Sequence, residues 1–110
     1  MTAPQPMPSA EPPPTVLVVE DEVLIRLAVA QYLRDCGWVV LEAGDAEEAL
    51  TILQAADVRV DLVFTDVQMP RALDGFGLAR WIRAHRPEVR VLLTSGAPAA
   101  MAAKAGDLCG

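Results

Sequence analysis

Apolar and polar positions divide this chain into two kinds of segment that alternate. Short runs of apolar, largely β-branched residues are typical of strands that are buried on both faces of a parallel sheet. These runs occupy residues 16–19, 38–41, 60–65 and 89–93. Segments with helical character or helical apolar spacing follow them at residues 23–36, 45–53, 75–85 and 98–105. The pattern predicts four strands alternating with four helices, and a loop at residues 106–110.

This order of elements predicts an α/β fold. Strands that alternate with helices form a parallel sheet with helices on both faces. Ligands of such sheets bind beyond the carboxyl ends of the strands. The chain has 110 residues, 53% of them hydrophobic, which is enough for one small domain. We therefore expect one domain over residues 15–110, with its chemistry at one edge of the sheet.

The first predicted helix carries an apolar stripe that ends on a cysteine. The stripe consists of Ile25, Ala28, Val29, Tyr32, Leu33 and Cys36. Because Cys36 lies on it, this residue is predicted to be a small core residue rather than a reactive thiol. The second cysteine is Cys109, and the chain contains neither a CxxC pair nor a Cys/His cluster. A structural zinc site is therefore not expected.

Residues 1–14 differ from the rest of the chain. They contain six of its nine prolines, which exclude a helix or a central strand. We predict a disordered or polyproline-like tail. A proline-rich ligand for a partner is the less favoured interpretation.

Charge and hydropathy limit the classes of partner. The net charge is −6, which argues against direct nucleic-acid binding by the domain. The chain has no run of about 20 apolar residues that would span a membrane, and no secretion signal at its start. Together with the cysteine usage, these features predict a soluble protein of the reducing cytoplasm.

Polar side chains follow three of the four predicted strands. Glu20-Asp21-Glu22 comes after the first strand, Asp66 ends the third, and Thr94-Ser95-Gly96 ends the fourth. Carboxylates gathered at one point repel one another unless a cation lies among them. Oxygen ligands of this kind suit Mg²⁺, which commonly takes few carboxylates, several waters and a phosphate oxygen. A helix-start role accounts for Glu22 but leaves Asp66 unexplained.

In these residues the chain resembles a response-regulator receiver domain over about residues 15–105. The matching segments are Val16-Leu17-Val18-Val19-Glu20-Asp21-Glu22, Phe64-Thr65-Asp66-Val67-Gln68-Met69-Pro70, Leu73-Asp74-Gly75 and Leu92-Leu93-Thr94-Ser95-Gly96. One extra residue between Pro70 and Leu73 lengthens the loop. The resemblance implies a flavodoxin-like fold with strand order 2-1-3-4, the family's fifth strand and fifth helix being absent. It also implies phosphotransfer from a histidine kinase or histidine phosphotransferase.

The resemblance assigns a role to each strand-end residue. Asp66 corresponds to the phosphorylated aspartate. Glu20 and Asp21 correspond to the acidic pair that binds Mg²⁺, with Glu20 where many members have aspartate. Gln68 stands where the family supplies a backbone carbonyl as a metal ligand. Thr94 corresponds to the hydroxyl residue that meets the phosphoryl group and passes its effect on, while Pro70 and Gly75 correspond to turn residues of the loop.

The chain departs from the family pattern at its C-terminal end. The family's phosphate-contacting lysine follows a fifth strand, whereas the one lysine here, Lys104, falls within the fourth predicted helix. We expect Lys104 to be a solvated helix position. The fourth strand would then be an exposed edge, which favours pairing with a second chain. The absent helix would also uncover apolar surface.

Three functions are compatible with these residues. The first is a phosphoacceptor signalling module without its own output domain, which would act through an unidentified output partner. The second is a receiver-like interaction protein that is not productively phosphorylated, which the displaced lysine favours. The third is an enzyme such as an Asp-nucleophile phosphatase, although Val67 and Gln68 after Asp66 offer no general acid. The first is the preferred interpretation, with phosphotransfer to itself and no external substrate.

Overall fold

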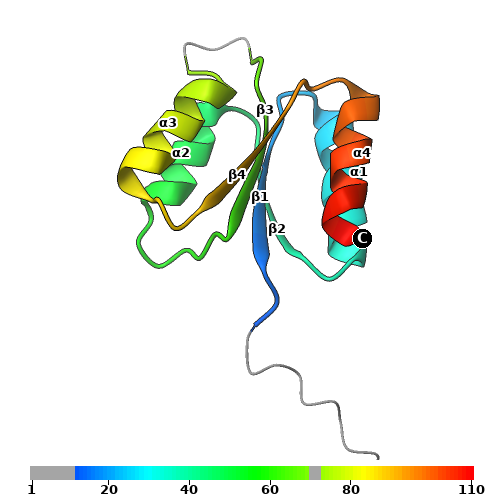
Figure 1. The fold of residues 1–110 in the computed structure, drawn as a ribbon, viewed down its shortest axis with the longest axis horizontal. Coiled ribbons are helices and arrows are strands. Elements are labelled where there is room, and N and C mark those ends of the chain that lie inside the picture. The colour runs from blue at the N-terminus through cyan, green and yellow to red at the C-terminus, as the bar shows by residue number, and fades with distance from the viewer. Residues whose placement is uncertain (1–11, 70–72) are drawn as a thin grey trace, which may run out of the picture.

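The computed structural model describes residues 12–69 and 73–110. Most of the tail predicted at residues 1–14 and the lengthened loop at residues 70–72 lie outside this part; residues 12–14 are exposed and belong to no helix or strand. The order of elements is the predicted one (Figure 1). It runs β1 (Thr15–Val19), α1 (Val23–Asp35), β2 (Val39–Ala43), α2 (Ala46–Gln54), β3 (Leu62–Asp66), α3 (Gly75–His85), β4 (Arg90–Thr94) and α4 (Pro98–Cys109).

The four described strands form one parallel sheet in the order β2-β1-β3-β4, as predicted. In the register, Val19 of β1 pairs with Thr65 of β3, and Asp66 of β3 pairs with Thr94 of β4. Every residue of β1 and β3 is buried, which explains why these strands are apolar runs rather than alternating patterns. The register brings the ends of β1, β3 and β4 to one edge of the sheet.

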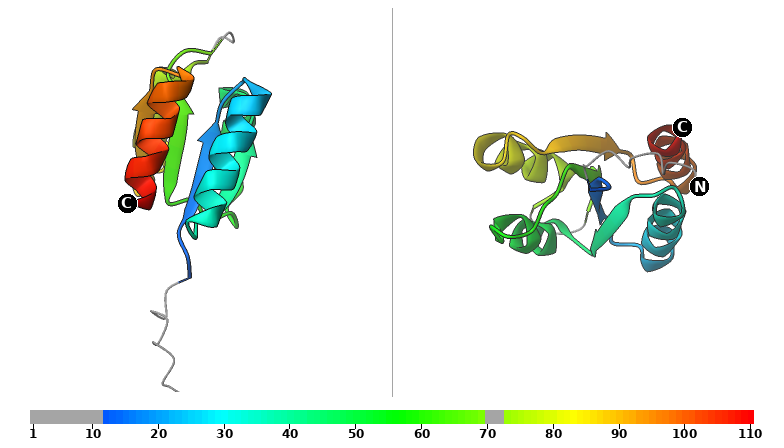
Figure 2. Two further views of the ribbon diagram at one scale, coloured as in Figure 1. Left: turned by 90° about the vertical axis from the view of Figure 1, so that its right-hand side faces the viewer. Right: turned by 90° about the horizontal axis from the view of Figure 1, so that it is seen from below.

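Two helices cover each face of the sheet, and each pair has its own apolar core (Figures 1 and 2). The helices α2 and α3 contribute Ala49, Leu53, Leu78 and Ile82 to one core. The helices α1 and α4 pack side by side over the other face. Their core consists of Val16, Val18, Val29, Ala30, Leu33, Val40, Leu62, Phe64, Met101 and Ala105. None of the described helices is long and apolar enough to cross a bilayer.

Local sequence explains most of the helix boundaries. The side chain of Asp45 accepts a hydrogen bond from the backbone N–H of Glu48, and Asp74 accepts one from Gly77. Both are N-caps that satisfy otherwise unpaired donors of the first helical turn. Gly37 has φ of 101°, a conformation that glycine adopts without strain, and the chain reverses there between α1 and β2. Asp45, Asp74 and Gly37 thus account for three of the helix boundaries.

Two predictions about the C-terminal half of the α1–α4 layer were wrong. Helix α4 continues to Cys109 instead of ending at residue 105, so residues 106–109 are helix rather than loop. Cys36 is exposed rather than a core residue, because α1 ends at Asp35 and Cys36 is its C-cap. Its sulfur forms a disulfide with Cys109, so the described chain has no free cysteine. The apolar spacing of the first helix continues to Cys36, one residue beyond the end of α1 at Asp35.

Candidate functional site

Three carboxylates meet at the carboxyl edge of the sheet. Glu20 follows β1 directly, Asp21 is the next residue, and Asp66 ends β3. One carboxylate oxygen from each lies within 4.8 Å of the others. Glu20 and Asp66 are buried, whereas Asp21 is exposed. The predicted acidic cluster is therefore present, with one side open to solvent.

Backbone N–H groups orient the two buried carboxylates. The Oδ1 atom of Asp66 accepts a hydrogen bond of 2.9 Å from the N–H of Gln68, and Oε2 of Glu20 accepts one of 3.0 Å from the N–H of Glu22. The other oxygen of Glu20, Oε1, is buried and has no hydrogen-bond partner. Each carboxylate is thus held through one oxygen, and the second oxygen of Glu20 stays available.

Burial and mutual repulsion favour the protonated form of both buried acids. Burial raises the pKa of Glu20 to about 7, helped by the neighbouring Asp21 and Asp66 and opposed by the Glu22 N–H. Burial also raises the pKa of Asp66, against the hydrogen bond from Gln68 and together with the charge of Asp21. A cation among the three would reverse both effects, because it stabilises the ionised forms.

The site also contains a buried hydroxyl group without a partner. Thr94 ends β4 beside Asp66 in the register, and its Oγ1 atom is buried with no hydrogen bond. Leaving such a group unpaired costs about 1–3 kcal/mol. The backbone carbonyl of Thr94 accepts a bond of 2.8 Å from the N–H of Val67, which ties the end of β4 to the loop after Asp66. A bound anion at Asp66 would give this hydroxyl an acceptor.

Two glycines allow the chain to approach Asp66 closely. Gly96 has φ of 85°, and a Cβ atom at this position would overlap the Asp66 carboxylate. A Cβ atom on Gly75 would overlap the backbone oxygen of Asp66, so α3 begins in close contact with the end of β3. The sequence analysis gave Gly96 no role of its own. Its position two residues after a strand-end threonine was the available signal.

Arg26 is a second residue that the sequence analysis missed. From the first turns of α1, its guanidinium donates 2.8 Å to the backbone carbonyl of Glu20 and 3.3 Å to the carboxylate of Glu42 on β2. Arg34 donates to the same Glu42 carboxylate at 3.1 Å. These bonds connect the loop that carries Glu20 to a neighbouring strand and helix. The apolar character of the first predicted helix gave no indication of this link.

The three carboxylates of the cluster and the unpaired Oε1 of Glu20 suit Mg²⁺ as ligands. All the side-chain ligands in this cluster are carboxylates, and Mg²⁺ prefers oxygen ligands of this type. A cation would also give the unpaired Oε1 of Glu20 a partner. Glu20, Asp21 and Asp66 are placed to hold it, whereas the carbonyl of Gln68 stays a predicted ligand. Lys104 is exposed on α4 and is not part of this cluster, as expected from the sequence.

Glu20→Gln is expected to stabilise the Mg²⁺-free protein at pH 8 while weakening Mg²⁺ binding. In the folded protein the pKa of Glu20 is raised from 4.5 to about 7, so the folded state binds the extra proton between these values. Stability of the Mg²⁺-free wild type therefore falls as pH rises through this window, by at most about 3 kcal/mol. Glutamine removes the buried charge and flattens this dependence.

Thermal unfolding in a chelator at pH 5 and pH 8 measures this difference. Glu47→Gln, on an exposed position of α2, is the matched control and should keep the wild-type pH dependence. A Glu20→Gln variant that loses stability equally at both pH values would contradict the assigned burial of charge.

Comparison with known proteins decides the family. The model of the response regulator receiver domain matches residues 16–108. The chain belongs to this family. It is 42% identical over 96 residues to the transcriptional regulatory protein PdtaR of Mycobacterium tuberculosis, which covers 86% of the chain and 45% of PdtaR. It is 39% identical over 82 residues to the sensor kinase CckA of Brucella abortus, covering 74% of the chain and 9% of CckA. The chain thus spans less than half the length of either relative.

Solved receiver structures share the fold. A response regulator receiver protein from Pseudomonas putida superposes with a TM-score of 0.69 at 33% identity, covering 89% of this chain and 80% of that one. The response regulator TrrA from Thermotoga maritima, solved in complex with Mg²⁺-BeF, gives a TM-score of 0.67 at 31% identity and covers 73% and 67%. This receiver domain is therefore a module of the two-component signalling family, and its relative TrrA was solved with Mg²⁺-BeF bound.

Proposed function

We propose that this receiver domain accepts a phosphoryl group on Asp66 from a histidine kinase or histidine phosphotransferase. The observation that carries the proposal is the Asp66 carboxylate itself. One of its oxygens is fixed by the Gln68 N–H, and it lies beside the Glu20–Asp21 pair and directly against Gly96. Proposed Mg²⁺ ligands are Glu20, Asp21, Asp66 and the backbone carbonyl of Gln68.

The chemistry follows from the positions of these groups. A carboxylate oxygen of Asp66 attacks phosphorus, an O–P bond forms, the N–P bond of the phosphohistidine breaks, and the imidazole nitrogen takes up a proton. Mg²⁺, when bound, offsets the repulsion between the carboxylate and the phosphoryl oxygens. Gly96 allows the Asp66 carboxylate to lie against the backbone that connects β4 with α4. The Thr94 hydroxyl then donates to a phosphoryl oxygen, which gives this buried group the acceptor that it lacks.

A switch follows from the same contact. Thr94 ends β4, and Gly96 lies on the short connection from β4 to α4. A hydrogen bond from Thr94 to a phosphoryl group would hold the end of β4 and so bias the start of α4. Phosphorylation would thus be read out on the α1–α4 layer of the molecule.

Asp66→Asn tests the proposal. Incubation of the wild type with acetyl phosphate and Mg²⁺ is expected to add one phosphoryl group, measured as the mass of the intact chain. The Asp66→Asn variant should gain none, since its amide cannot form the acyl phosphate. Asp57→Asn is the matched control and should label fully, because Asp57 is exposed and is not part of the acidic cluster. Undiminished labelling of a folded Asp66→Asn variant would refute the assignment.

A second candidate function is a receiver-like interaction module that is not productively phosphorylated. The observation that favours it is the position of Lys104, which lies exposed on α4 while the acidic cluster has no lysine within the described residues. Without that cation, less charge is available to stabilise the transferred group. Wild type that stays unlabelled with Mg²⁺ and a small phosphodonor, while remaining folded, would favour this function.

The remaining inferences concern partners and place of action. We propose that the domain acts on no external phosphoester, binds no nucleic acid directly and works in the cytoplasm. We also propose a homodimer through the edge of β4, which ends the strand order among the described strands and is only partly buried. A measured solution mass that stays monomeric at high concentration would contradict the dimer.

A further inference from the structure

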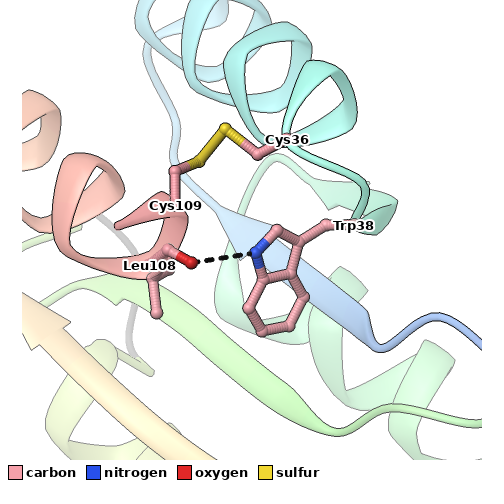
Figure 3. The surroundings of a disulfide bond; sticks show 4 residues. All are labelled: Cys36, Trp38, Leu108 and Cys109. Atoms are coloured by element: carbon pink, nitrogen blue, oxygen red, sulfur yellow. Dashed lines mark hydrogen bonds between the residues drawn. A yellow bond between two sulfur atoms is a disulfide. The ribbon is translucent and has the colours of Figure 1, made fainter. Parts of the chain in front are cut away.

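The disulfide between Cys36 and Cys109 joins the ends of two helices that cover the same face of the sheet. Cys36 caps α1 and Cys109 is the last residue of α4, with Cα atoms 5.6 Å apart and 73 positions between them in sequence. Figure 3 shows the bond beside Trp38, whose indole N–H donates to the backbone oxygen of Leu108 at 3.4 Å. Cys36 is an exposed residue, and Cys109 is partly buried.

Helix α4 has few other features that hold it in place. Of its twelve residues only Met101 and Ala105 are fully buried. Its N-cap is Ala97, which makes no side-chain capping bond, and Gly106 lies in the helix interior where glycine weakens it. A helix of this length is marginal in water on its own. The disulfide and the Trp38 bond therefore supply much of what keeps its C-terminal half on α1.

We propose that the Cys36–Cys109 pair is a reversible thiol–disulfide site, and that its reduction by a dithiol releases the C-terminal half of α4 from α1. This inference does not depend on Asp66 being the phosphoacceptor. It predicts two states of the α1–α4 layer: an oxidised state with α4 fixed, and a reduced state in which α4 opens locally.

The exchange reaction is balanced by the dithiol. A thiolate of the reductant attacks Sγ of Cys36, the more exposed of the two residues, the S–S bond breaks, and Cys109 leaves as a thiolate that takes up a proton. The second thiol of the reductant then attacks the mixed disulfide and releases Cys36, so the reductant becomes a disulfide. Two electrons and two protons are transferred to the pair. In a reducing compartment such disulfides are usually transient or redox-sensing rather than permanent.

The position of α4 connects this site with the rest of the molecule. The helix begins at Pro98, two residues after Gly96, and the disulfide lies at its other end. Opening of α4 would uncover the apolar core between the α1–α4 layer and the sheet, including Val29, Leu33 and Phe64. Reduction of this one disulfide would therefore expose apolar core residues under α4 to solvent.

The one lysine of the chain provides a direct test. Lys104 lies in α4 and is followed by the buried Ala105, so a lysine-specific protease needs local opening of the helix to cleave there. We expect cleavage at Lys104 at least tenfold faster after reduction with a dithiol than before it. In the oxidised protein a cleaved fragment stays attached through Cys109, so mass spectrometry distinguishes the states.

Matched variants separate the redox effect from damage to the fold. The Cys36→Ser, Cys109→Ser double variant should be cleaved at the fast rate with and without the dithiol, while circular dichroism verifies that the sheet is intact. Re-oxidation of the wild type should restore slow cleavage. Equal cleavage rates in the oxidised and reduced wild type would overturn the proposal, as would thiols that never form the bond in a glutathione buffer.

Discussion

Replacing Cys36 and Cys109 together by serine is expected to lower the free energy of unfolding by roughly 4 kcal/mol. The disulfide closes a loop across a sequence separation of 73 residues, and cross-linking so long a segment removes much conformational freedom from the unfolded chain. For a domain of this size the corresponding fall in Tm is about 15–30 °C. Urea unfolding followed by circular dichroism measures the change.

The reduced wild type is the control for this stability effect. Serine is close in size to cysteine and Cys36 is exposed, so the double variant should unfold at the same urea midpoint as the reduced wild type. Adding a reductant to the double variant should change nothing. A variant as stable as the oxidised wild type would show that α4 and its packing residues hold the layer together without the bond.

Gly96→Ala is expected to reduce labelling of the receiver domain by acetyl phosphate tenfold or more. The added Cβ atom would overlap the Asp66 carboxylate, so either this side chain or the loop after β4 must move. A positive φ of 85° adds a backbone cost of about 1–2 kcal/mol for alanine. Labelling kinetics with Mg²⁺ and thermal unfolding measure the two effects separately.

Gly106→Ala is the matched control for this substitution. It lies within α4, and a Cβ atom at this position meets nothing within 4 Å. Alanine there should raise stability by about 0.5–1 kcal/mol and leave labelling unchanged. If Gly96→Ala labels like the wild type, the carboxylate has another position open to it and Gly96 has no part in the site.

The sequence predicted the sheet and its chemistry because both depend on local patterns. Continuous apolar runs indicated buried parallel strands, and the acids that follow them were placed together by the sheet geometry alone. Strand boundaries shifted by one or two residues: β3 begins at Leu62 instead of residue 60, and it ends on Asp66. The observed strand ends lie close to the predicted ones because polar or turn residues flank each apolar run and end the strand.

The α1–α4 layer was predicted less well because its structure depends on distant contacts. Ala28 and Tyr32 lie on the predicted apolar stripe yet are exposed, because they line an open apolar pocket together with residues of α4. The buried residues of α1 are Val29, Ala30 and Leu33. Nothing in the local sequence of α1 shows that a helix more than 60 positions later packs against it. For the same reason the pairing of the two cysteines, and with it the length of α4, could not be read from periodicity.

The side of the sheet on which α4 lies has a topological consequence. The connection from β3 to β4 passes over the face covered by α2 and α3, as right-handed crossovers in that direction require. A further parallel strand beside β4, reached through α4 in its present position, would need the rare left-handed connection. While the Cys36–Cys109 bond is closed, α4 stays on the same face as α1. A strand reached through α4 could then join beside β4 only by that left-handed connection.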